Sequence, residues 1–432
     1  MIQAVPAHTS SVLEISEWDE HFLPDATLSP NDRQLAQQLL PSRRLMVDEM
    51  LNGVRIQSQS WVGLVRFDRF DVRIIPKLSD GNARLVQMLA LTGGLDLAWH
   101  SQASRELHAE RSDDLLDLLS LLLVRECERI LAGGVLHDYI EREEALPVVR
   151  GRFLADRQWR KRFGQFNVLE CRFDEHESDI DENRLLAFTL GVSRVLVRNP
   201  LLYRRVLSLY EQFASICECE YIDPKVVRGR LVYHRLNAHY EDAHRLCWLI
   251  LESMGITDLL ASGSLRSNVF LLDMNLLFER FVQKLLEFSL GRSYRVDYQK
   301  RSRSILWDVN RHRTYGTVIP DFKLTGPEGN LIVDSKYKLG DKLDPSDIYQ
   351  CFLYAQAFGN VLVEPSHAML IVPSTSGLVE HWSLQVRSAQ SVPKSVLHKV
   401  AVPVAAAADE MQSQKPGAVA ATVAKLVAQA IA

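Results

Sequence analysis

The 432-residue sequence predicts a multidomain α+β protein. Its length favours two or three domains, and a hydrophobic content of 47% is sufficient for packed cores. The pattern of side chains changes twice along the chain, from strand-like alternation to helical periodicity and then to a mixture of both. We therefore expect a small β-rich domain at 1–80, a helix-rich middle region at 81–260, an α/β core at 261–400 and an alanine-rich tail at 401–432.

In the N-terminal region, two apolar segments predict a β-hairpin. Segments 61–67 and 70–76 flank an Asp-Arg turn, and pairing them sets Val65 beside Val72. This internal consistency favours a small sheet or barrel. Residues 29–50, which begin with Ser-Pro-Asn-Asp, are expected to be helical.

The middle region reads as helices joined by short loops. A long amphipathic helix is expected from Ser112 to two glycines at 133 and 134, and further helices fill 182–255. Residues 157–163 place several basic side chains around two aromatic ones. That cluster suits a DNA backbone, a protein partner or an ordinary exposed face equally well.

From residue 268 onwards, helices and strands alternate in a compact series. The expected elements are a helix at 268–290, strands at 294–299 and 304–309, a hairpin within 317–338, a helix from 344 to about 358, and strands at 367–373 and 381–386. This order is compatible with a mixed sheet that carries a helix on each face. The tail at 401–432 suits either a final helix or an extension without fixed structure.

The predicted hairpin carries the strongest chemical signal in the sequence. Asp321 follows a proline, and Asp334 stands thirteen residues later in the triplet Asp-Ser-Lys336. A hairpin centred between residues 327 and 328 sets the two aspartates opposite each other and puts Lys336 on the same face. Opposed residues have Cβ atoms roughly 4.5–5.5 Å apart, close enough for two carboxylates to share Mg²⁺, with Mn²⁺ as an alternative. Lys336 is then placed to orient water or to stabilise charge on a phosphate.

This arrangement of two acids and a lysine matches the PD-(D/E)xK pattern of metal-dependent nucleases, which implies a restriction-endonuclease-like core. In that fold an acid on the first helix often completes the metal site, so Glu279 is a candidate catalytic residue and third metal ligand; the alternative is a surface glutamate. Gln350 and Tyr354 share one helix face, as in the QxxxY of RecB-like nucleases. That resemblance makes Gln350 a catalytic candidate and Tyr354 a DNA-binding candidate, unless Tyr354 only packs. Lys338 either contacts phosphate or is a solvated charge.

Composition limits the remaining possibilities. A net charge of −4 and a pI near 6.4 exclude a globally basic nucleic-acid-binding protein, so DNA contacts must come from local patches. Six dispersed cysteines without a CxxC pair, and an N-terminus without a secretory pattern, predict a cytoplasmic protein. We find no apolar run long enough to span a membrane and no P-loop motif.

Taken together, the order and spacing of short motifs resemble the McrC family, the nuclease subunits of McrBC modification-dependent restriction systems. The resemblance covers most of the chain and rests on segments 61–65, 72–78, 138–144, 149–153, 171–175, 182–186, 274–281, 319–322, 333–338 and 347–350. It implies a DNA endonuclease subunit that cuts only with a McrB-like AAA+ GTPase hexamer. The partner recognises modified cytosine in double-stranded DNA and translocates, and GTP enters only through it.

The same resemblance implies that the N-terminal part docks into the partner ring and stimulates nucleotide hydrolysis. Asp321, Asp334 and Lys336 match the catalytic triplet of the family. Two other functions stay open from the sequence. One is a self-sufficient RecB-like repair nuclease, and the other is a non-catalytic adapter that activates an AAA+ partner.

Overall fold

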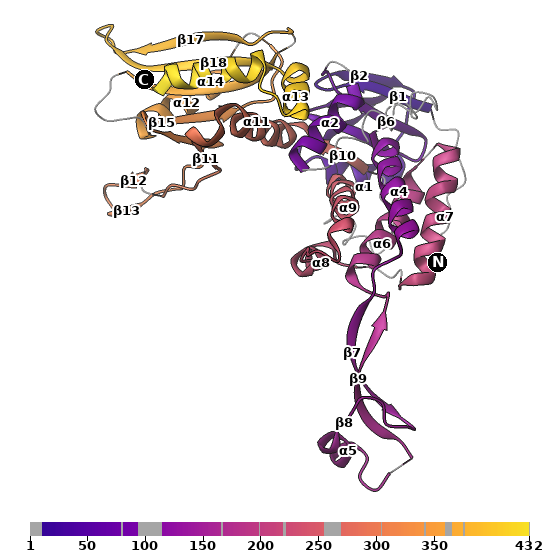
Figure 1. Ribbon diagram of the computed structural model, residues 1–432. Coiled ribbons are helices and arrows are strands. Elements are labelled where there is room, and N and C mark those ends of the chain that lie inside the picture. Colours follow the sequence, from indigo (N-terminus) through magenta and orange to yellow (C-terminus); the bar gives the residue numbers. More distant parts are fainter. Residues whose placement is uncertain are drawn as a thin grey trace. The chain divides into compact units, whose positions relative to one another are not determined.

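The computed structural model (Figure 1) describes residues 11–78, 81–93, 115–165, 167–197, 199–218, 222–254, 269–303, 305–340, 343–358, 365–374 and 376–431. These residues form two compact units. The first joins the described residues of Thr9–Ser104 to those of Asn268–Ala432, and the second holds those of Arg105–Ser267. The first unit is therefore discontinuous in sequence, and the four-part division expected above stays a prediction.

The N-terminal part of the first unit contains two small sheets. One has the order β1 (Ser11–Ser16), β6 (Phe70–Ile75), β5 (Trp61–Arg66), β10 (Val269–Asp273), and the other has the order β2 (Glu20–Pro24), β4 (Gly53–Ser58), β3 (Leu45–Met50). Strands β5 and β6 form the expected hairpin, with Val65 opposite Val72. Apolar side chains of both sheets share one core. The predicted N-terminal hairpin is confirmed.

Helix α1 (Pro30–Leu39) is shorter than expected. It begins with a capping box between Ser29 and Asp32. The helix predicted over 29–50 is wrong for its last part, because residues 45–50 form strand β3. Leu45 is buried and β3 pairs antiparallel with β4, so strand pairing outweighs the local helical signal.

The helix predicted at 268–290 also starts later than expected. Residues 269–273 form β10, which pairs antiparallel with β5, and helix α11 (Met274–Leu290) follows with Asp273 as its N-cap. Gly63 permits this pairing, since a Cβ there would lie 2.1 Å from the carbonyl oxygen of Phe270. A short apolar run before a cap residue can form either a strand or the start of a helix. Here it forms a strand, because the edge of β5 is available for pairing.

The C-terminal part of the first unit is a six-stranded mixed sheet. Its order is β11 (Arg295–Tyr298), β14 (Phe322–Gly326), β15 (Gly329–Ser335), β16 (Ser366–Ser374), β18 (Pro393–Pro403), β17 (Glu380–Arg387). Strands β15, β16 and β18 run parallel, and the remaining pairings are antiparallel. Helix α12 (Pro345–Phe358) packs on β15, β16 and β18, and α11 and α14 (Ala418–Ile431) also contact the sheet. The strands expected at 294–299, 367–373 and 381–386 are confirmed, as is the helix ending at Phe358.

Three features of this part differ from expectation. The described residues of the segment, 305–309, contribute only β12 (Trp307–Asp308), which pairs with β13 (Arg313–Thr314) in a separate ribbon. Strand β18 was not expected, and it pairs with both β16 and β17. The tail completes β18 and then forms α13 (Val404–Ser413) and α14, whose apolar faces are buried. Helix α2 (Gly81–Gly93) belongs to the same unit and contacts α11 and α13.

The second unit combines a helical body with a long antiparallel arm. Its main helices are α4 (Leu115–Gly133), α6 (Asp181–Leu196), α7 (Pro200–Ile216), α8 (Pro224–Arg230) and α9 (Glu241–Ser253), which confirms the helices expected within 182–255. The arm consists of β7 (Asp138–Leu146), β9 (Leu169–Glu177), β8 (Arg152–Phe153) and α5 (Ala155–Lys161), and α5 lies at its far end (Figure 1). Helix α4 ends at the expected glycine, but its predicted start at residue 112 lies outside the described residues. In the described ranges, no helix is both long and apolar enough to cross a membrane.

Candidate active site

The hairpin β14–β15 has the register that the sequence predicts. Phe322 pairs with Val333 and Gly326 with Gly329, which leaves a two-residue turn at 327–328. One further step in this register sets Asp321 opposite Asp334. The predicted register is confirmed from Phe322 to Gly329, and the carboxylates of Asp321 and Asp334 lie close enough to interact.

Asp334 is a buried carboxylate with few partners. Its side chain is 1% exposed, and Oδ2 lies 2.7 Å from Nζ of Lys336. Within the described part of the chain, no group donates a hydrogen bond to Oδ1. Burial raises the pKa of Asp334 to about 7, and the charge of Asp321 adds to this effect while Lys336 opposes it. The buried position thus disfavours the charged form of this carboxylate.

Asp321 is oriented by the residue that follows Asp334 in the chain. The backbone N–H of Ser335 donates to Asp321 Oδ2 over 2.8 Å, and the hydroxyl of Ser335 donates to the same oxygen over 3.0 Å. On the other side, the backbone N–H of Gln299 donates to the carbonyl oxygen of Asp321 over 2.8 Å. These contacts fix both the backbone and the carboxylate of Asp321.

Lys336 remains a cation in this setting. Burial works to lower the pKa of its ammonium, but the carboxylates of Asp334 and Asp321 outweigh burial and the pKa is raised. The backbone N–H of Lys336 donates to the carbonyl oxygen of Ile371 over 3.0 Å, which continues the pairing with β16. The structure therefore brings Asp321, Asp334 and Lys336 into one cluster.

Glu279 approaches this cluster from α11. Its Oε1 accepts a hydrogen bond of 2.7 Å from the side chain of Gln299. Burial raises the pKa of Glu279, the nearby charge of Asp321 raises it further, and Lys336 lowers it. Among the described residues, however, no three acid, histidine or cysteine side chains form a group able to hold a metal ion. Glu279 as a third ligand therefore stays a prediction.

The two residues predicted on α12, Gln350 and Tyr354, are linked by hydrogen bonds to the segment that precedes Asp321. The side chain of Gln350 donates to the hydroxyl of Tyr354 over 2.8 Å, and that hydroxyl donates to the carbonyl oxygen of Ile319 over 3.3 Å. Tyr354 is 5% exposed and packs with Val318 and Ile332. The pair is thus positioned to brace the segment that leads into Asp321, and the predicted contact of Tyr354 with DNA stays a prediction.

Lys338 is engaged by acidic side chains at the start of α12. Its Nζ lies 2.8 Å from a carboxylate oxygen of Asp347 and also pairs with Asp344. These contacts occupy the ammonium in this structure, so phosphate binding by Lys338 stays a prediction.

The sequence analysis missed two residues that hold Asp321, namely Ser335 and Gln299. The place of Ser335 between Asp334 and Lys336 was the available signal, whereas nothing local marks Gln299.

The donor set suits a hard divalent cation. Asp321 and Asp334 offer carboxylate oxygens across the hairpin, and Asp334 Oδ1 is buried without a hydrogen-bond donor in the described residues. Magnesium is usually bound through one or two carboxylates together with water and phosphate. The residues present therefore fit Mg²⁺.

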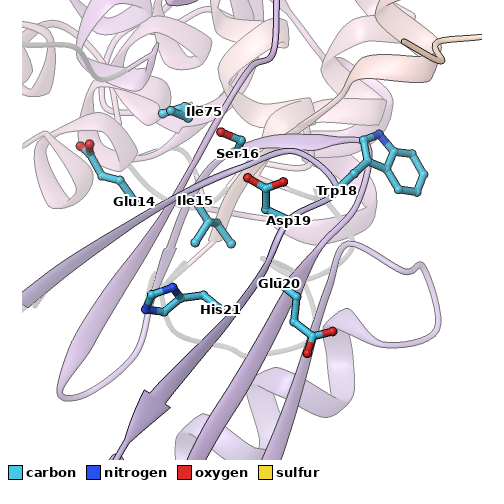
Figure 2. A pocket seen from close by; sticks show the side chains of 8 residues that line it. All are labelled: Glu14, Ile15, Ser16, Trp18, Asp19, Glu20, His21 and Ile75. Carbon is cyan, nitrogen blue, oxygen red and sulfur yellow. The ribbon is translucent and has the colours of Figure 1, made fainter. Parts of the chain in front are cut away.

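A separate pocket lies in the N-terminal part of the same unit. Figure 2 shows it around the turn between β1 and β2, and it is lined by Glu14, Ile15, Ser16, Trp18, Asp19, Glu20, His21 and Ile75. None of the residues of the aspartate–lysine cluster contributes to this lining. The pocket and the cluster are therefore distinct features of the unit.

The fold and the cluster together define a multidomain, mixed α/β chain with paired acids at the end of a hairpin. The profile of the family described as "McrBC 5-methylcytosine restriction system component" matches residues 56–373. The chain belongs to this family, which confirms the relationship that its McrC-like motifs indicate. A search of curated proteins gave no match.

Solved structures show a similar fold. One is a refined half-complex from the tetradecameric assembly of Thermococcus gammatolerans McrB AAA+ hexamers with bound McrC; it matches with a TM-score of 0.64 and 17% identity, covering 94% of this chain and 99% of that chain. Another, a cryo-EM structure of the Thermococcus gammatolerans McrBC complex, has a TM-score of 0.47 and 18% identity, covering 65% and 88%. The first likeness extends over nearly the whole chain and supports its multidomain α/β architecture.

Proposed function

We propose that this chain is the Mg²⁺-dependent DNA endonuclease subunit of a McrBC-like restriction complex. The observation that carries the proposal is the buried carboxylate of Asp334, which faces Asp321 and is paired with Lys336. Buried acids with raised pKa values beside a specific charge partner are typical of functional sites. The mixed sheet with α11 before the hairpin and α12 after it supports a PD-(D/E)xK core.

In this proposal each residue of the cluster has a defined role. Asp321 and Asp334 hold the cation, with Glu279 as a further ligand and Mn²⁺ as an alternative to Mg²⁺. When bound, the cation neutralises phosphate charge and makes water a better nucleophile. Ser335 keeps the carboxylate of Asp321 aimed across the hairpin. Lys336 supplies positive charge where negative charge develops on the phosphate, while Gln350 and Tyr354 hold the backbone before Asp321.

The proposal includes an AAA+ partner. Family membership supports a place in a McrBC system, and the similar solved assembly contains McrB AAA+ hexamers with bound McrC. We infer that a McrB-like GTPase hexamer recognises modified cytosine in double-stranded DNA and that this chain stimulates its GTP hydrolysis. We also propose that the complex acts in the cytoplasm, in line with the dispersed cysteines of the chain.

The test is a cleavage assay on methylated and unmethylated DNA, with and without the McrB-like partner, Mg²⁺ and GTP. We expect Asp334→Ala to abolish cutting while stimulation of the partner GTPase survives. Glu328→Ala is the matched control, because Glu328 is an exposed acid at the turn of the same hairpin. Cleavage that persists in Asp334→Ala would refute the site.

Two measurements, the same cleavage assay and restriction in cells, separate the two other functions that the sequence leaves open. Efficient cutting by the isolated chain without nucleotide would favour a self-sufficient nuclease. Normal restriction in cells that carry Lys336→Ala would favour a non-catalytic adapter.

A further inference from the structure

Glu17 is a second buried carboxylate of the first unit, and it lies outside the aspartate–lysine cluster. It stands in the turn between β1 and β2 and is 0% exposed. Its Oε2 accepts hydrogen bonds from the backbone N–H of Lys77 over 2.9 Å and from the hydroxyl of Tyr337 over 2.8 Å. Its Oε1 is buried without a hydrogen-bond partner in the described residues. Burying a carboxylate lowers the stability of the fold unless hydrogen bonds compensate for the lost water. An oxygen that stays without a partner therefore calls for an explanation.

The side-chain partner of Glu17 is Tyr337, which follows Lys336 in the sequence. Tyr337 is 3% exposed, and its ring lies 5.9 Å from the ring of Phe278 between centroids. Phe278 directly precedes Glu279 on α11. Tyr337 is therefore held on one side by the N-terminal turn and on the other by the helix that carries a predicted metal ligand.

Residues 336 to 338 are each fixed on a different element. The backbone N–H of Lys336 donates to Ile371 of β16, and the side chain of Lys338 pairs with Asp347 of α12. The hydroxyl of Tyr337 donates to Glu17 of the N-terminal turn. Loss of this last bond would leave a buried phenol and a buried carboxylate short of a partner, which favours movement of the backbone that carries Lys336.

The turn around Glu17 is itself held in an uncommon conformation. The next residue, Trp18, has a φ of 60°, which is unusual for a bulky side chain and persists only where the surroundings fix it. Ser58 helps to do so, because its hydroxyl donates to the carbonyl oxygen of Ser16 over 2.7 Å and accepts from the backbone N–H of Asp19 over 2.9 Å. Figure 2 shows Ser16, Trp18 and Asp19 around the pocket that opens over this turn.

We propose that Glu17 is a positioning residue for the nuclease site: through Tyr337 it holds Lys336 in place and makes cleavage depend on the N-terminal sheet. The inference rests on the proposed function for its effect on cleavage. It adds a physical link from a turn of the N-terminal sheet to the lysine of the cluster. All the residues of this link belong to the first unit.

The experiment compares the wild type with Glu17→Ala, Glu17→Gln and Tyr337→Phe in the complete complex with partner, Mg²⁺ and GTP. Small displacements of catalytic groups lower rates strongly, so we expect Glu17→Ala and Tyr337→Phe to reduce kcat by about tenfold to a hundredfold. The KM for DNA should stay within about twofold, because the link does not touch the substrate. Glu17→Gln should restore most of kcat, since its amide oxygen accepts the same two hydrogen bonds.

Two further variants separate positioning from a general loss of stability. The double variant Glu17→Ala/Tyr337→Phe should be no slower than the worse single variant, because both changes break one link. Glu14→Ala is the matched control, since Glu14 lies three residues before Glu17, on β1, but pairs at the surface with Arg73. Unchanged kcat in Glu17→Ala would overturn the proposal. The proposal would also be overturned if Glu17→Gln and Glu17→Ala lost kcat equally and if both losses followed a decrease in the amount of folded protein.

Hydrogen exchange keeps the proposal testable if the wild type does not cut DNA. That outcome would refute the proposed function, yet the link itself predicts faster amide exchange at residues 336–338 in Glu17→Ala. Exchange in strands β16 and β18 should stay as in the wild type. Unaltered exchange at 336–338 would overturn the link.

Discussion

The arm β7–β9 and the hairpin β14–β15 are both antiparallel ribbons that bring acids close to basic side chains. They shift the pKa values of the acids compared here in opposite directions. In the arm, Glu143 accepts hydrogen bonds from Arg172, and Glu177 accepts two from Arg142 at 2.8 and 2.6 Å. These arginines lower the pKa of both glutamates. In the hairpin, burial raises the pKa of Asp334 to about 7 despite its lysine partner.

The arm's charges support the fold, whereas the hairpin's charges suit the reaction that we propose. In the arm, Glu143 and Glu177 are each paired with a partly exposed arginine, and a pair of this kind contributes little and tolerates loss. The hairpin buries an acid among too few donors, an arrangement that weakens the fold unless a ligand completes it. We therefore expect changes in the hairpin to affect activity strongly and changes in the arm to affect it little.

The largest effect is expected for Lys336→Met. This change removes the cation that we assign to the phosphate, and loss of such a group lowers catalysis by about a hundredfold or more. Cleavage rates of the complex with its partner would show this. Lys323→Met on the same hairpin is the control and should cut normally. A cleavage rate of Lys336→Met within threefold of the wild-type rate would contradict the proposed difference between the hairpin and the arm.

A smaller effect is expected in the pH dependence of stability. The folded-state pKa of Asp334 is raised from 3.8 to about 7, so the folded protein binds a proton that the unfolded chain has released. This group therefore stabilises the fold fully below about pH 4, and its contribution is lost as the pH rises towards 7. In the presence of a chelator, the Tm of the wild type should fall relative to that of Asp334→Asn by several degrees between pH 5 and 8. Parallel Tm curves for the two proteins would contradict the buried, proton-binding state.

The smallest effect is expected for the arm. Glu177→Gln replaces the partner of Arg142, whose side chain is exposed, so the Tm should change by no more than about 2 °C, and less in high salt. DNA cleavage by the complex should keep its wild-type rate. A large loss of cleavage at unchanged Tm would show that the arm's charges also serve the reaction.

Much of the hairpin could be predicted because its rules are local. Strand side chains alternate, and a two-residue turn between Gly326 and Gly329 leaves one register that joins the acids and the apolar side chains at once. The same reasoning predicted β5 and β6 from Val65 and Val72. The end of α4 at Gly133 followed from the pair of glycines at 133 and 134.

The rest depends on contacts between distant segments. Strand β10 looks like the start of a helix until the edge of β5 is available, and β18 needs β16 on one side and β17 on the other. The bond from Tyr337 to Glu17 joins residues 320 positions apart, and the bond from Gln299 to Asp321 joins the residues next to β11 and β14, two strands that are separate in the sequence. Periodicity and local propensity carry no information about such pairs, so these parts of the site are visible only in the folded chain.

Strand β10 also sets the order in which a growing chain can fold. Strand β5 ends at Arg66, but the strand that covers its edge begins at Val269. At a synthesis rate of about 5–20 residues per second, the ribosome needs roughly 10–40 s to make the intervening stretch. During that time the newly made edge of β5 has no partner from β10, and open edges recruit strands from other chains. The insertion between the two strands thus turns a pairing in the finished protein into a period of vulnerability during its synthesis.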